Sequence, residues 1–179
     1  QIVVNERFAL FLREQRPFFL EGADIFSMPK QLVYTRSIVS PVGAVKVSGK
    51  VGAFNVAYLG AVDEVNAGTS NPMVNLLRVK RDMGQSSTIG AVYTDRTERG
   101  IDFNRVFGAD AQLVLGGRYR INLLAAGSAD GASGAATDWG SMVTASVSRA
   151  SRKVSMSASF EDVDKDFRAG SGFIRRTGI

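Results

Sequence analysis

Hydrophobic and polar side chains alternate with a period of two along most of the chain, from Leu32 onward. The clearest segment lies between Lys153 and Glu161, where apolar residues occupy the even positions and mostly serines occupy the odd ones. Successive side chains of a strand point to opposite sides, so this pattern predicts a half-buried β-strand. Similar alternation marks residues 45–50, 107–115, 119–126 and 139–148, and noisier strand-like stretches are 53–62, 73–82 and 86–95.

The connections between these segments alternate in length. Short turns are expected at Val51-Gly52, Met83–Gln85, Gly116-Gly117 and Ala150-Ser151, and longer loops at 63–72, 96–100, 129–138 and 163–170. Successive hairpins of this kind predict an all-β fold, an antiparallel up-and-down meander. We expect roughly ten strands, with about 10 residues in each of the longer ones, that form a complete or incomplete transmembrane β-barrel.

The first thirty residues follow a different pattern. Residues 5–15 place several apolar side chains on one helical face, and Pro17 is expected to end any such helix. Phenylalanine recurs between Phe8 and Phe26, and so much apolar surface needs cover. We therefore divide the chain into a Phe-rich segment, residues 1–31, packed on or in the barrel, and the barrel or barrel fragment, residues 32–179.

The amino-acid composition excludes several classes of catalytic and metal-binding site. The chain has 179 residues, of which 45% are hydrophobic and 22% charged, as in a folded domain. It contains no cysteine and no histidine, which excludes disulfides, thiolate zinc sites and His-based catalytic triads. No apolar run approaches the roughly 18 residues of a membrane helix. We predict a protein that is not an enzyme and has no catalytic residue, metal or cofactor.

Two all-β architectures remain open at this point. Small residues on the polar face, long strands and aromatic residues near segment ends favour a membrane barrel with a narrow interior. The alternative is a soluble or surface-exposed all-β binding module, for example for carbohydrate, in which the same apolar residues build the core of a sandwich.

Charge adds a weak asymmetry and three candidate site residues. Basic residues flank the short turns and acidic residues cluster toward the long loops, whereas the net charge of +5 is too small and scattered to predict nucleic-acid binding. Arg78, Arg118 and Arg120 either point into a lumen, where they would contact anionic solutes, or extend to the membrane boundary. Both placements stay open.

Other motifs fail as binding sites. The run Asp162-Val163-Asp164-Lys165-Asp166 has the spacing that opens a calcium-binding EF-hand loop. Phe167 stands where that loop needs glycine, and Phe173 stands where it needs a bidentate glutamate. We interpret the run as a solvated acidic loop.

Several motifs resemble a known family. The most specific is Arg16-Pro17-Phe18-Phe19-Leu20-Glu21-Gly22, and the others are Arg7–Phe11, a strand at Val33–Arg36, Gly49–Gly52 and the stretch from Phe160 to Phe173. Together they are similar to an uncharacterised family of bacterial outer-membrane β-barrel proteins. In that family the barrel commonly follows a domain that resembles family-nine carbohydrate-binding modules. That domain is absent here, and the family's barrel is longer than this chain.

The resemblance implies a location in the bacterial outer membrane and no established catalysis. It also implies that the chain is the first part of a longer barrel. The expected function is passage or surface binding of a solute. The expected partners are the lipid bilayer and a carbohydrate or other small solute, without nucleic acid, and the oligomeric state stays open.

Overall fold

The computed structural model describes residues 11–64, 71–98, 102–132, 134–174 and 176–179. Short helical turns come first, followed by a series of strands, in the order α1 (Pro17–Leu20), η1 (Ala23–Phe26), η2 (Thr35–Ser37), β1 (Pro41–Val51), β2 (Phe54–Asp63), β3 (Met73–Met83), β4 (Ser87–Glu98), β5 (Asp102–Leu115), β6 (Tyr119–Gly131), β7 (Asp138–Ala150) and β8 (Ser155–Val163). The strands lie where the alternating segments predicted them.

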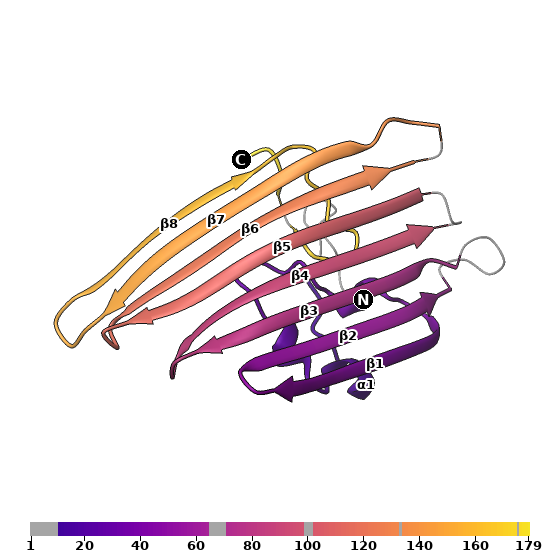
Figure 1. The fold of residues 1–179 in the computed structure, drawn as a ribbon. Coiled ribbons are helices and arrows are strands. Elements are labelled where there is room, and N and C mark those ends of the chain that lie inside the picture. Colours follow the sequence, from indigo (N-terminus) through magenta and orange to yellow (C-terminus); the bar gives the residue numbers. More distant parts are fainter. Residues whose placement is uncertain (1–10, 65–70, 99–101, 133, 175) are drawn as a thin grey trace, which may run out of the picture.

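The strands form one antiparallel sheet in chain order, as Figure 1 shows. Short turns join β1 to β2, β3 to β4, β5 to β6 and β7 to β8. We call the end of the strands where these turns lie the turn end. The opposite end of the strands, where β2 leads to β3 and β4 to β5, is the loop end. The prediction of an all-β, up-and-down antiparallel meander is therefore confirmed.

The predicted strand number was wrong, and the sheet is not closed into a complete barrel. The sheet has 8 strands instead of the roughly ten expected from alternation. Along the described residues it runs from β1 to β8 as an open sheet, without closing into a barrel.

One overcounted strand is the stretch at Val33–Arg36. There the backbone N–H of Tyr34 donates to the carbonyl of Ser171 at 2.7 Å, and the N–H of Phe173 donates to the carbonyl of Gln31 at 2.8 Å. Because these backbone groups bind the C-terminal segment, the stretch does not join the sheet.

The expected role of Pro17 is also corrected. Residues 11–16 are not helical, and the rest of the predicted helix over 5–15 lies outside the described residues. Pro17 instead begins α1 as its first residue. Proline suits this position because its fixed φ is already helical and its missing N–H would have no helical partner there.

The sheet has two unlike faces. Residues 11–40, 164–174 and 176–179 lie on one of them, which we call the covered face (Figure 1). The other face, the open face, carries no described segment. Cross-strand register places Tyr58, Leu77, Tyr93 and Phe107 in one row on the open face, and their immediate neighbours in the chain lie on the covered face.

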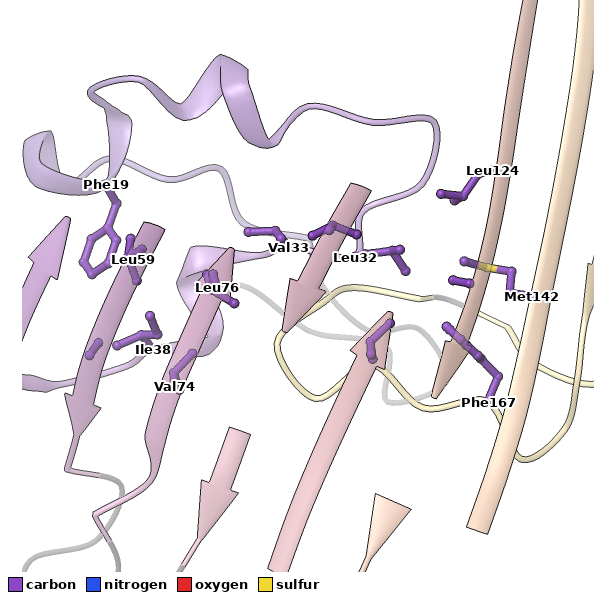
Figure 2. Close-up of a cluster of buried hydrophobic side chains, with 14 of the residues drawn as sticks. Phe19, Leu32, Val33, Ile38, Leu59, Val74, Leu76, Leu124, Met142 and Phe167 are labelled. Atoms are coloured by element: carbon purple, nitrogen blue, oxygen red, sulfur yellow. The ribbon is translucent and has the colours of Figure 1, made fainter. Parts of the chain in front are cut away.

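The hydrophobic core lies between the covered face and the terminal segments (Figure 2). The sheet contributes Leu59, Val74, Leu76, Val92, Val106, Leu124 and Met142, and the terminal segments contribute Phe19, Leu32, Val33, Ile38 and Phe167. Each side chain in the core is at least nine-tenths buried. The terminal segments therefore supply one-third of the buried core residues.

Two glycines allow this close packing. A Cβ atom on Gly140 of β7 would lie 2.3 Å from the backbone of Phe167, and one on Gly108 of β5 would lie 2.9 Å from the side chain of Leu32. Any larger residue would hold the terminal segments away from the sheet.

Candidate functional site

The middle of the open face is an apolar band without charge. Among the strand residues that the structure describes, it includes Val45, Val47, Val56, Tyr58, Leu77, Val79, Ile89, Tyr93, Phe107, Leu113, Ile121, Leu123, Val143, Val147, Met156 and Phe160. Many of these side chains are more than one-third exposed, including Phe107 at 54% and Phe160 at 59%. Such a continuous apolar surface marks a contact with lipid or with another protein.

Charged side chains of the open face lie only at its two borders, among the strand residues described. They are Arg81 and Arg149 at the turn end, and Asp95, Arg105 and Asp162 at the loop end. The apolar band therefore has charged side chains at both its turn end and its loop end.

Each of the three arginines lies over an aromatic ring at its own border of the band. The guanidinium carbon of Arg105 lies 4.4 Å from the ring centre of Phe103. Arg81 lies 5.4 Å from Phe54, and Arg149 lies 5.5 Å from Tyr119. Pairs of an arginine and an aromatic ring suit a boundary between an apolar and an aqueous medium, because the ring is apolar and attracts the cation, while the guanidinium remains accessible to water.

The charge-free band is long in the strand direction. Along β5, the charge-free stretch of the open face runs from Phe107 to Leu115. This stretch has nine residues and, at roughly 3.4 Å per residue, is about 27 Å long in the strand direction. A tilted membrane-spanning β-strand has about 9–11 residues, so the stretch reaches the lower end of that range.

The open face also contains a shallow apolar depression of about 680 Å³. Small residues line its floor, including Ala91, Ala109, Ala125 and Gly127. It has little polar surface with which to orient a ligand. We therefore regard it as part of the apolar band and not as a separate site.

The covered face is divided into two halves. Its loop-end half is filled by the core. Its turn-end half is polar and only partly buried, and includes Asn55, Lys80, Thr88, Gln112, Arg120, Asn122, Ser146, Ser148 and Ser157. Asn122 Nδ2 donates to Ser146 Oγ at 3.1 Å, and Lys50 Nζ pairs with Asp82 at 2.6 Å.

A buried ion pair lies where these two halves meet. The side chains of Arg78 and Asp110 are 0% and 2% exposed, and they form a two-pronged contact in which Arg78 Nη2 donates to Asp110 Oδ2 at 3.0 Å. Arg78 Nε also donates to the carbonyl of Ile25, at 3.2 Å. Arg78 thereby joins β3, β5 and η1.

Glycine on the intervening strand makes this pair possible. Arg78 reaches from β3 to β5 across Gly90 of β4, and a Cβ atom on Gly90 would lie 2.7 Å from the guanidinium. The absence of that atom provides the space in which Arg78 lies flat against the sheet.

Cationic side chains bind carbonyl groups at the ends of the short helical turns. Lys46 Nζ donates to the carbonyls of Phe18 and Glu21 at the end of α1. Arg16 donates to Thr35 and Ile38 around η2, at 2.9 and 2.7 Å. These carbonyl oxygens carry partial negative charge, so hydrogen bonds from a cation stabilise them. The carbonyl of Thr35 also accepts a hydrogen bond from the N–H of Ile38, at 3.0 Å. These contacts attach the N-terminal segment to the sheet and to itself.

Glu14 completes the contact network around Arg16. Its carboxylate accepts hydrogen bonds from Arg16 Nε and Nη2, each at 2.8 Å, and from Thr35 Oγ1 at 2.7 Å. The hydrogen bonds from Arg16 are the main reason that the pKa of Glu14 falls to about 2. Glu14 is consequently ionised, and its contacts intact, at any physiological pH.

The three candidate arginines are not brought together. Arg78 is buried in its pair with Asp110, Arg120 lies exposed on the turn-end half of the covered face, and Arg118 is exposed in the turn before β6. The sequence interpretation missed Asp110 and Gly90 as partners of Arg78. A charged residue within the alternating stretch 107–115 was the signal that could have indicated Asp110.

The acidic run near the C-terminus forms a local turn. Asp164 Oδ1 accepts a hydrogen bond from the N–H of Asp166 at 3.0 Å. Across the parts of the chain that the structure describes, no group of three metal-binding side chains is suitably placed to hold an ion. None of the described helices is long and apolar enough to cross a membrane.

Comparison of the chain with protein-family models, curated protein sequences and solved structures gives no match. The arguments for function therefore rest on the two faces of the sheet.

Proposed function

We propose that this chain is the membrane-embedded sheet of a non-enzymatic bacterial outer-membrane β-barrel protein. The open face contacts lipid, and the covered face is the barrel interior. The protein acts in the passage or surface binding of a small solute such as a carbohydrate. The single observation that carries this proposal is the charge-free apolar band with arginine–aromatic pairs at both borders.

The placement of charged residues on the two faces supports the open face as the one that contacts lipid. The buried ion pair of Arg78 and Asp110 lies on the covered face, at mid-strand. On the open face the mid-strand positions of the described strands are uncharged. Charged groups at membrane depth are costly unless they face the interior and pair with one another.

The interior is partly closed by the chain itself. The terminal segments fill the loop-end half, so solutes are handled on the polar turn-end half. Hydroxyl and amide groups of Asn122, Ser146 and Gln112 offer donors and acceptors to a sugar or a similar hydrophilic solute. Arg120 and Lys80 add positive charge to this surface, which favours solutes that carry negative groups.

Membrane extraction and tag accessibility test the proposal. We expect the chain to remain with washed outer membranes and to be released only by detergent. A peptide tag in the long loop at Gly134 should then be labelled on intact cells, and a tag in the short turn at Gly117 should be labelled only after the membrane is opened.

The two tags serve as matched controls, because both glycines have a positive φ and open space around a Cβ. Recovery of untagged protein in the soluble fraction would instead support a soluble all-β binding module. Labelling of Gly117 alone on intact cells would invert the assigned ends of the sheet.

A further inference from the structure

The two ends of the sheet carry opposite charge. The basic residues of the strands and turns at the turn end are Lys50, Lys80, Arg81, Arg118, Arg120, Arg149, Arg152 and Lys153. In the described strands and turns of that end, Asp82 is the single acidic residue, and it already pairs with Lys50 at 2.6 Å. The strand ends at the loop end hold Asp63, Asp95, Glu98, Asp102, Asp130, Asp138 and Asp162, against Arg96 and Arg105. Positive charge is therefore concentrated at the turn end.

Five of these cations lie on two neighbouring turns. They are Arg118, Arg120, Arg149, Arg152 and Lys153, and we call them the basic rim. The N–H of Ala150, at the end of β7, donates to the carbonyl of Arg118 at 3.2 Å. This hydrogen bond ties the turn before β6 to the turn before β8. The two turns therefore hold their cations side by side.

The turn before β8 holds two of these cations at its tip. Ser151 Oγ donates to the carbonyl of Val154 at 2.8 Å, and the N–H of Ser151 donates to the same carbonyl at 3.0 Å. These hydrogen bonds close the turn around Arg152 and Lys153, and both residues are exposed. Arg118 is also exposed, in the turn before β6. The cations of the two turns are consequently accessible to a partner.

The charge of the basic rim is not neutralised within the described chain. None of the ion pairs among the described residues includes one of its five members. Arg149 instead lies over the ring of Tyr119 at the border of the apolar band, so the basic rim begins where the band ends. Like charges on adjacent turns repel one another, and external anions offset that repulsion.

We propose that the basic rim binds the phosphate groups of anionic phospholipids. This inference rests on the proposed membrane placement and names the lipid that the turn end contacts. A cluster of about four to eight Lys and Arg residues beside a membrane-spanning segment is typical of binding to anionic headgroups. The planar guanidinium of arginine matches two phosphate oxygens at once. Four of the five members are exposed, so the basic rim suits the many headgroups of a lipid surface and not one enclosed ion.

Flotation with vesicles of defined composition tests this inference. The full chain is diluted from urea into vesicles of phosphatidylcholine, with or without phosphatidylglycerol, and the vesicle-bound fraction is measured against lipid concentration. Half-maximal binding should need about tenfold less lipid when phosphatidylglycerol is present. High salt should reduce this gain, because salt screens the attraction to the headgroups. Inorganic phosphate should have no more effect than chloride at the same ionic strength, and a selective loss in phosphate would overturn the proposal in favour of a discrete phosphate site.

Two charge-matched variants locate the contact. Arg152→Gln/Lys153→Gln removes two exposed cations from the basic rim and should abolish most of the gain from phosphatidylglycerol. Lys165→Gln/Arg176→Gln removes the same charge from exposed positions of the C-terminal segment and should retain the gain. Equal losses in the two variants would overturn the proposal, because the net charge of the chain would then explain the binding.

A wash at high pH separates this inference from the proposed function, because it releases peripheral protein and leaves inserted protein in the vesicles. Equal binding to both lipid mixtures that resists the wash would overturn the role of the basic rim and leave the membrane-embedded sheet supported. Binding that needs phosphatidylglycerol and is removed by the wash would support the basic rim and contradict the membrane-embedded sheet. A chain that binds neither mixture would contradict both.

Discussion

Val106 and Phe107 are neighbours on β5, yet Val106 is 0% exposed and Phe107 is 54% exposed. The same contrast holds on the central strands from β2 to β7, where both faces carry valine, leucine and alanine, whereas β1 and β8 are exposed on both faces for nearly their whole length. On the covered face the chain buries these residues itself, with segments from both ends. On the open face no described segment covers them. Alternation therefore identifies two faces of a sheet but does not tell which one the chain will bury.

The two faces also treat charge differently. The covered face holds the ion pair of Arg78 and Asp110 in the middle of its strands, with a backbone carbonyl as a third partner. The open face has its charges at the borders, where arginines stack on aromatic rings. A paired charge is stable within a protein interior, whereas an unpaired one needs water.

The largest expected loss in the free energy of unfolding comes from replacing the buried Arg78, and it should exceed the loss from replacing Arg81 at the border of the open face. Arg78→Met leaves the carboxylate of Asp110 buried without its partner, and should lower the free energy of unfolding by about 3–5 kcal/mol. Arg81→Met on the open face removes an exposed cation–π contact and should lower it by about 1 kcal/mol or less. Urea titrations of the refolded protein measure both. The double variant Arg78→Met/Asp110→Leu should recover most of the loss, and a failure to do so would contradict the pairing argument.

A second prediction places the same new charge on each face of β8. Ala158→Arg introduces a cation into the apolar band, and should destabilise the protein in lipid vesicles by roughly 2–4 kcal/mol. Ser157→Arg lies on the turn-end half of the covered face and should have an effect of about 1 kcal/mol or less, because that half is polar and Ser157 is exposed. Unfolding titrations of the two variants in the same vesicles measure the two losses in the free energy of unfolding. Equal losses would show that the faces are assigned incorrectly.

A third prediction compares two glycines. Gly90→Ala places a methyl group 2.7 Å from the guanidinium of Arg78, and should destabilise the protein by about 1–3 kcal/mol. Gly127→Ala on the open face has its nearest such contact at 3.9 Å, and should change stability by less than about 0.5 kcal/mol. Chemical denaturation measures the free energy of unfolding of both variants. Equal values for Gly90→Ala and Gly127→Ala would contradict the argument that Arg78 requires the absence of a Cβ atom at Gly90.

The smallest expected effect is on pH dependence at the covered face. The pKa of Glu14 is lowered from 4.5 to about 2, mainly by hydrogen bonds from Arg16, so its contribution to stability is present above about pH 4.5. That contribution is lost as the pH falls toward 2 and the folded carboxylate becomes protonated. Solvent screening reduces it to about 1 kcal/mol.

Thermal midpoints of the native chain and Glu14→Gln measure this effect. The variant should melt at a lower temperature at pH 6, and the difference should close by pH 2. A difference that is the same at both pH values would assign the loss to packing and not to ionisation.

The strands could be predicted from the sequence because their signal is local. A period of two needs only neighbouring residues, and turn residues between the segments give antiparallel order. The strand expected at Val33–Arg36 from the family resemblance was wrong. The hydrogen bonds of this stretch go to Ser171 and to the segment around Phe173, residues far along the chain. The local rule also failed for Pro17, since proline is compatible with both the end and the beginning of a helix.

The sequence by itself determined the all-β class, the hairpin order and the alternation of apolar and polar faces, because each depends on residues close together in the chain. Only the tertiary structure decided which face the terminal segments cover, and that Arg78 meets Asp110 across Gly90. It also decided that Ile179 lies against Val163 at the free edge of β8. These contacts join residues distant in sequence, and their positions depend on the register and curvature of the whole sheet, which no local pattern encodes.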